Sequence, residues 1–238
     1  GTTYFSAVIF IGYAGRIGWN FGVSSTWIGI GNAIFGSYLA WKVLASRTRK
    51  MTHDLNASTM PEFFEKRYDS KAMKVFSAVV IFVFLVPYTA SVYQGLGYLF
   101  EQTFHVDFVY CMAAMAILTG IYLLLGGSVA PAINDFIQGI IMIVGVILML
   151  VFIIKSPEVG GFGEGISRLG DIKPDLATVF GGSPMKLLSL VVLTSFGTWG
   201  LPQMVHKFYA IKDENAIKKA TIVSTLFALL IGGTAYFT

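Results

Sequence analysis

The sequence predicts an all-α integral membrane protein in which two of the transmembrane helices are interrupted. Of the 238 residues, 55% are hydrophobic and 13% are charged, and the mean hydropathy is +0.70. These values lie far from those of an average soluble domain. About seven apolar segments are long enough to cross a bilayer, and the first and the sixth contain glycines or a proline inside the apolar run.

The apolar segments alternate with polar connections. The expected spans are 4–22, 26–43, 75–100, 108–125, 133–154, 186–206 and 220–238. A tight turn is expected at 126–132 because of its glycines and proline. In the first long connection, Thr59 and Glu62 have the spacing of a capping box, and Pro61 fits a first helical turn. A short helix is therefore predicted there.

The basic residues predict the orientation of the chain. Eight of the 17 Lys and Arg residues lie in 42–74 and four lie in 207–219. By the positive-inside rule, the loops 43–74 and 207–219 are expected to be cytoplasmic and the connection 155–185 extracytoplasmic. The first and sixth spans would then cross in opposite directions. These residues flank apolar runs and form no aromatic-rich basic patch, so no nucleic-acid partner is expected.

The two interrupted spans are the strongest functional signal. In 4–22 the regular helix is weakened by Gly12, Gly15, Gly18 and Gly22, and in 194–203 by Gly197, Gly200 and Pro202. A broken helix leaves backbone groups that lipid tolerates only where they line a cavity or hold a ligand. Two broken spans at matching places in two halves of a chain are typical of a transporter binding site. The alternative is that the glycines only allow close helix packing.

The solute is expected between the two breaks near the middle of the membrane, and the residues expected to face it are the candidate ligands. The candidates are Ile9, Tyr13, Asn32, Tyr88, Gln94, Thr194, Gly197, Thr198 and Trp199. Asn32 lies in the centre of an apolar run, so its amide either binds ligand or forms a hydrogen bond to a neighbouring helix. The aromatic side chains are also compatible with a purely structural role in the core.

Asp135 is an acidic residue inside an apolar span, near the expected cytoplasmic end of 133–154. A carboxylate there is costly unless it meets water, a partner or a cation. It also follows a turn, where it could interact with the N-terminal dipole of a helix. The sequence has no phosphate-binding glycine loop with lysine, no His cluster and no recognisable pair of nucleophile and base. No enzymatic activity is therefore expected.

Four runs resemble the sodium:solute symporter family. The run LLGGSVAPAINDFIQGIIM (124–142) is the most specific of them, and FSAVIFIGYAG (5–15), STMPEFFEKRY (58–68) and GLPQMVHKFYA (200–210) follow the same family pattern in order. The resemblance covers essentially the whole chain. It implies a LeuT-like bundle of two inverted five-helix repeats, in one transmembrane domain, 1–238. The first repeat would occupy about 1–154 and the second would begin at about 185–238, so an internal fragment is expected.

The resemblance also implies a function. The chain is expected to belong to a secondary transporter of the plasma membrane (the cell inner membrane) that carries a small organic solute together with sodium by alternating access. Sodium would bind the backbone carbonyls of Thr2 and Phe5, and Asp135 would lie on its release path. Ile9 and Gly197 differ from the residues of sugar carriers, which disfavours a sugar as solute. The alternative is the membrane input domain of a sensor protein.

Overall fold

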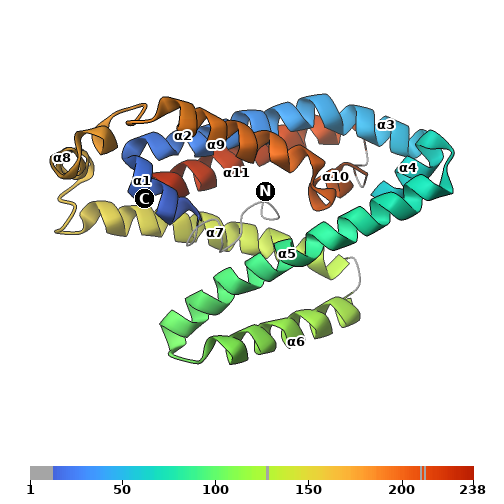
Figure 1. Ribbon diagram of the computed structural model, residues 1–238, viewed down its shortest axis with the longest axis horizontal. Helices are drawn as coiled ribbons and strands as arrows, with labels where there is room; N and C mark the ends of the chain where they lie inside the picture. The colour runs from blue at the N-terminus through green and yellow to red at the C-terminus, as the bar shows by residue number, and fades with distance from the viewer. Residues whose placement is uncertain (1–12, 127–128, 210, 212) are drawn as a thin grey trace.

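The computed structural model describes residues 13–126, 129–209, 211 and 213–238, and the regular structure among them is helical (Figure 1). The elements are α1 (Gly15–Phe21), η2 (Gly22–Ser25), α2 (Thr26–Gly31), η3 (Asn32–Leu39), η4 (Trp41–Ala45), α3 (Ser46–Asp54), α4 (Met60–Tyr68), α5 (Lys71–Phe104), α6 (Phe108–Gly126), α7 (Val129–Lys155), α8 (Phe162–Ile172), η5 (Pro174–Ala177), α9 (Pro184–Gly197), η6 (Thr198–Gly200), α10 (Pro202–Tyr209) and α11 (Glu214–Phe237).

The elements α1, α2, η3, α9 and α11 pack side by side and are called the body here (Figure 1). Its core is built largely from small side chains, among them Ala14, Ala33, Ala228 and Ala235. Small residues allow close helix packing, which matters in lipid because the hydrocarbon offers no hydrophobic drive for helices to associate. The helices of the body are therefore held together by the close approach of their backbones.

The closest approach within the body lies between α2 and α11. A Cβ atom added to Gly29 would lie 2.4 Å from the carbonyl carbon of Gly232, so no larger residue fits without moving the backbone. Nearby, the fully buried Ser25 donates a hydrogen bond from its hydroxyl to the carbonyl oxygen of Tyr236, 211 positions away. These two contacts join the early part of the chain to its last helix.

Gly22 ends α1 and has a φ angle of 57°, which favours glycine. A Cβ atom there would also lie within 2.2 Å of the carbonyl oxygen of Leu176. Of the glycines expected to interrupt the first span, Gly15 and Gly18 lie inside α1 and Gly12 lies outside the described residues. In the part of this span that the structure describes, the helix therefore ends at Gly22.

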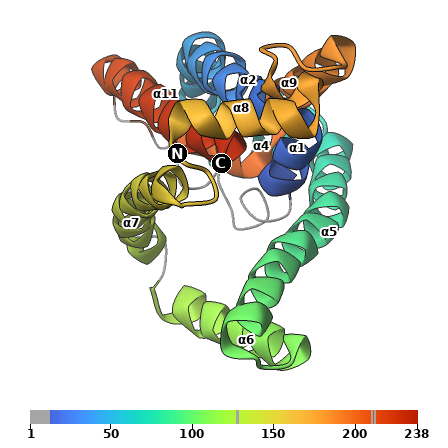
Figure 2. The same ribbon diagram turned by 90° about the vertical axis from the view of Figure 1, so that its left-hand side faces the viewer.

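The elements α5 and α6 form a hairpin that extends away from the body and is called the arm here (Figure 2). Ser70 caps α5, because its hydroxyl accepts a hydrogen bond from the backbone N–H of Met73 at 3.4 Å. This explains why α5 begins before the expected residue 75. After the hairpin in the sequence, α7 begins at Val129, inside the expected turn 126–132. The turn prediction was too long because a proline is tolerated in the first turn of a helix.

The described residues contain four helical stretches that are long and apolar enough to cross a membrane, or five if the bent pair of α9 and α10 counts as one span. The stretch Gly15–Asp54 counts once, although two spans were expected over it, because helical and 3-10 turns follow one another from α1 to α3. Gly22, with a φ angle of 57°, nevertheless departs from helical geometry between α1 and α2. The count of seven spans and the LeuT-like arrangement stay predictions. That the chain is helical and rich in membrane-spanning segments agrees with the sequence.

The connection 155–185 covers one end of the body, where α8 lies across the helices (Figure 2). The indole N–H of Trp27 donates a hydrogen bond to the carbonyl oxygen of Val179 at 3.0 Å, and its ring stacks on Phe180. Phe162 of α8 stacks on Phe237 of α11. The connection thus contacts both α2 and α11 of the body.

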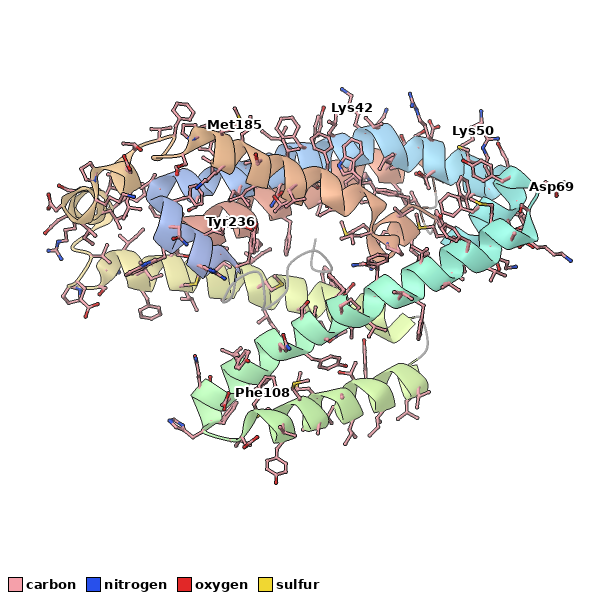
Figure 3. All side chains as sticks on the ribbon, in the orientation of Figure 1. Lys42, Lys50, Asp69, Phe108, Met185 and Tyr236 are labelled. Atoms are coloured by element: carbon pink, nitrogen blue, oxygen red, sulfur yellow. The ribbon has the colours of Figure 1, made fainter. Side chains whose placement is uncertain are left out.

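The loop 43–74, which is rich in basic residues, lies at the other end of the long axis of the molecule. Figure 3 shows Lys50 and Asp69 of this loop far from Met185. Here the predicted capping box is confirmed. The hydroxyl of Thr59 accepts a hydrogen bond from the Glu62 backbone N–H at 3.3 Å, and the Glu62 carboxylate accepts one from the Ser58 backbone N–H at 2.9 Å. The basic loop 43–74 and the connection 155–185 therefore lie at opposite ends of the molecule, as the distribution of basic residues predicts. Which end faces the cytoplasm stays a prediction.

Candidate binding site at the helix break

The predicted break in the sixth span is confirmed. The helix α9 ends at Gly197, and after one short turn in η6 the residue Leu201 is extended, with a ψ angle of 123°. Leu201 precedes Pro202, and the residue before a proline avoids the helical region. Pro202 lacks an N–H to continue the hydrogen-bond ladder but suits the first turn of α10. The two halves of the span meet at a bend of 51°.

A buried polar cluster lies one turn before the break and joins α9 to η3. The amide oxygen of Asn32 accepts hydrogen bonds from the hydroxyls of Thr194, at 3.0 Å, and Ser195, at 2.9 Å. Asn32 is 4% exposed and Ser195 is fully buried. These three residues are called the Asn32 cluster. Of the two interpretations open for Asn32, the structure shows the hydrogen bond to a neighbouring helix.

A further contact connects the break itself to η3, because the indole N–H of Trp199 donates to the backbone carbonyl of Phe35 at 2.9 Å. Within the broken span, the Thr198 hydroxyl donates to the carbonyl of Ser195 in α9 at 2.7 Å. The element η3 is a π-helix, a geometry that often occurs at functional sites. A Cβ atom on Gly36 would lie 3.4 Å from the Cα atom of Ser195, so the two backbones approach closely here.

A cavity of about 550 Å³ opens beside the break, between η3, η4, α7, α10 and α11. Its lining is mainly apolar and aromatic, with Thr198 and Trp199 at the break. On another wall the Ser37 hydroxyl donates to the Ser224 hydroxyl at 3.2 Å. The carboxylate of Asp135 on α7 and the ammonium of Lys207 on α10 form an ion pair at 3.2 Å, and both residues line the cavity. A cavity of this size that is apolar with a few polar groups suits a small solute.

A second cavity, of about 460 Å³, lies against the extended residue Leu201 and its neighbours at the break. It is lined by Gly200, Leu201 and Pro202, by Tyr88 on α5 and by Phe64 on α4. The break is therefore accessible from two sides. Gly197 itself borders open space, because a Cβ atom there would meet nothing within 4 Å among the described residues.

The structure brings together only some of the predicted site residues. Asn32, Thr194, Thr198 and Trp199 meet at the break, and Tyr88 lies across the second cavity from it. Tyr13 packs edge-on against Tyr236 in the body, with ring centroids 6.3 Å apart. Gln94 is exposed on α5 and takes part in none of these groupings. The predicted residues Thr2, Phe5 and Ile9 lie outside the described part of the chain.

Two contributors were missed by the sequence analysis. Ser195 completes the Asn32 cluster, and its position directly after Thr194 was the only available signal. Lys207 was interpreted as a topology signal because it follows an apolar run, and its partner Asp135 is 72 positions away. Asp135 lies in the second turn of α7, which begins at Val129. The ion pair could not be inferred from spacing.

Comparison with known proteins provides the family. The model of the sodium:solute symporter family matches residues 1–236. The osmoregulated proline transporter OpuE and the high-affinity proline transporter PutP of Bacillus subtilis are each 32% identical to the chain, over 90% and 91% of it and over 46% and 48% of their own lengths. The sodium/proline symporter of Staphylococcus aureus is 31% identical over 92% of the chain and 43% of its own length.

The chain thus spans less than half the length of these curated relatives. No solved structure matches it. The family and the relatives named are membrane transporters, not enzymes. Because the family match extends over nearly every residue, this chain belongs to the sodium:solute symporter family.

Proposed function

We propose that this chain is part of a sodium-coupled secondary transporter that carries a small organic solute by alternating access. The observation that carries the proposal is the bent break between α9 and α10, which borders a cavity and carries polar groups. Backbone that departs from a regular helix within a membrane belongs where it lines a cavity or holds a ligand. The relatives named above are transporters, which favours this function over the input domain of a sensor.

The proposed architecture is LeuT-like. The first five-helix repeat would occupy about 1–154, the second would begin at about 185–238, and 155–185 would be extracytoplasmic. The break in α9–α10 supports this arrangement, since discontinuous helices at the interface of inverted repeats hold the solute in such folds. The protein would lie in the plasma membrane with its loops 43–74 and 207–219 in the cytoplasm, in contact with lipid along its apolar helices.

The solute would bind beside the break, near Thr194, Gly197, Thr198 and Trp199. In this arrangement Asn32 orients the hydroxyls of α9 and contributes its amide to the same site. The remaining candidates are Ile9, Tyr13, Tyr88 and Gln94. Proline is the first solute to test, because the relatives are named as proline transporters.

Sodium would be the coupling ion, bound by the backbone carbonyls of Thr2 and Phe5 and leaving past Asp135. These are hard oxygen donors, which suit a small cation. At a membrane potential of about 100 mV, one sodium ion supplies about 2.3 kcal/mol, and a tenfold concentration gradient adds about 1.4 kcal/mol. The sum corresponds to roughly 500-fold accumulation of a neutral solute, so one ion is sufficient.

The proposal is tested by uptake of labelled proline into liposomes that contain the full-length protein. An inward sodium gradient is expected to drive accumulation above equilibrium, and uptake that is indifferent to the gradient would contradict sodium coupling. Gly197→Leu is expected to abolish uptake by filling the open space beside the break. The matched control is Gly120→Leu on α6, which also meets nothing within 4 Å among the described residues and is expected to transport normally.

The proposed role of Asp135 is tested separately. Asp135→Asn keeps the shape of the side chain but removes its charge, so the rate of sodium-dependent turnover is expected to fall while the protein remains folded. Kinetics identical to those of the unaltered protein would remove Asp135 from the ion path.

A further inference from the structure

The ion pair between Lys207 and Asp135 bridges two elements that are far apart in sequence. Lys207 lies on α10, the helix that follows the break, Asp135 lies on α7, and both residues line the 550 Å³ cavity. The ammonium and the carboxylate are 3.2 Å apart, and the two side chains are 50% and 33% exposed. The pair therefore lies at an accessible edge of the cavity rather than deep within it.

The chemistry of the pair makes it easy to exchange. Lysine presents a compact ammonium on a flexible stem, so it can leave a carboxylate without moving the backbone. Half-exposed ion pairs contribute little to stability because water solvates both charges when they separate. A carboxylate bordered by apolar residues such as Phe136 and Ile140 is nevertheless incompletely solvated, so a cation beside it is favourable. Lys207 and a free cation would therefore compete for Asp135.

We propose that Lys207 is a tethered counter-cation that occupies Asp135 in the absence of sodium and promotes sodium release by replacing the departing ion. This inference rests on the proposed function, in which Asp135 lies on the sodium path. It assigns to Lys207 a positioning role. No bond is made or broken in this exchange, and the net charge beside the cavity changes only by the ion that leaves.

The position of Lys207 links this exchange to α10, the half-span that would move in alternating access. The lysine belongs to the half-span that follows the bend of 51°, so the pair draws α10 toward α7 and sodium lets the two separate. Coupling of this kind is reciprocal. Separation of α10 from α7 must therefore raise sodium affinity as much as sodium favours separation.

The first test uses the unaltered full-length protein. A water-soluble amine-acylating reagent is applied in sodium chloride or in choline chloride at equal ionic strength, and the modification of each lysine is measured by peptide mass spectrometry. Sodium is expected to raise the labelling rate of Lys207 about two- to five-fold, a range that suits a half-exposed ion pair. Lys218, an exposed lysine on α11, is the internal control and should not change. An unchanged ratio of Lys207 to Lys218 labelling overturns the proposal.

The second test measures the sodium concentration that gives half of the maximal thermal stabilisation. Lys207→Met is expected to lower this concentration about two- to five-fold, while Lys207→Arg and the control Lys218→Met resemble the unaltered protein. In an Asp135→Asn background, Lys207→Met should have no effect. An unaltered value for Lys207→Met, or an equal effect in both backgrounds, contradicts the tethered cation alone. Absence of any sodium-dependent stabilisation in the unaltered protein would instead contradict the proposed sodium coupling.

Discussion

The body and the arm have similarly apolar surfaces but are held in place very differently. In the most apolar stretch of α5, 6% of the residues are buried, compared with 33% in α11. Yet the most apolar stretch of α5 has the higher mean hydropathy, 2.2 against 1.7 for that of α11. Among the residues that the structure describes, hydrophobicity therefore does not decide which helices pack together. In a lipid environment, glycine contacts and interhelical hydrogen bonds decide it, because the hydrocarbon solvates leucine as well as a neighbouring helix does.

The largest expected effect comes from closing the glycine contact of the body. Gly29→Ala would place a methyl group against the backbone of Gly232, which has no side chain that can move aside. We expect a loss of about 2–3 kcal/mol of stability, measured as thermal or denaturant unfolding of the purified protein in detergent. Gly145→Ala on α7 is the control, since it meets nothing within 4 Å among the described residues. Equal stability of the two variants would show that the close approach does not hold the body together.

The Asn32 cluster is expected to have the next largest effect. Asn32→Ala and Ser195→Ala should each destabilise the protein, and together they should cost less than the sum of their separate effects. A coupling of about 0.6–1.7 kcal/mol is expected from interhelical hydrogen bonds in membranes. Unfolding of the four proteins of this double-mutant cycle provides the measurement. Strict additivity would mean that the hydrogen bond between Ser195 and Asn32 does not contribute to stability.

In the arm, a similar glycine substitution should matter much less. A Cβ atom on Gly97 would lie 2.6 Å from the ring edge of Phe108, but this ring belongs to a side chain that can shift. Removing a helical glycine also favours the helix by about 1 kcal/mol, so Gly97→Ala is expected to change stability by less than about 1 kcal/mol. Any change in the hydrogen-exchange protection of the backbone amides should be confined to α5 and α6. Loss of protection throughout the body would show that the two regions unfold as one unit.

The smallest effect concerns the cap of α4, outside the membrane segments. The backbone N–H of Ser58 is the main cause that lowers the pKa of Glu62 below its usual value, because it donates to the charged carboxylate. A pKa lowered in the folded state stabilises the helix above the ordinary pKa, and this contribution is lost as the pH falls through the lowered value. The protection factors of the amides at the start of α4, which are corrected for the intrinsic pH dependence of exchange, should therefore fall in acid. Glu62→Ala should show the lower protection already at neutral pH and no further loss in acid.

Local chemistry explains which features could be predicted from the sequence. The break was predictable because Gly197, Gly200 and Pro202 each act on the backbone next to them, and the cap of α4 because Thr59 and Glu62 are three residues apart. By contrast, the contact of Gly29 with Gly232 and the pair of Lys207 with Asp135 depend on helices meeting across the fold. Nothing in the residues around Lys207 distinguishes a cavity lysine from one that faces headgroups, so its role required the structure.

The hydrogen bond from Ser25 to the carbonyl of Tyr236 has a consequence for biosynthesis. Its two partners are 211 positions apart, and at about 5–20 residues per second a ribosome needs roughly 10–40 s to synthesise the chain between them. During that time the hydroxyl of Ser25 and the glycine surface of α2 lack their final partner. The nascent protein must therefore be accommodated by lipid or by an insertion machinery until α11 emerges, and a ribosome that stalls before α11 would leave a product whose body cannot close.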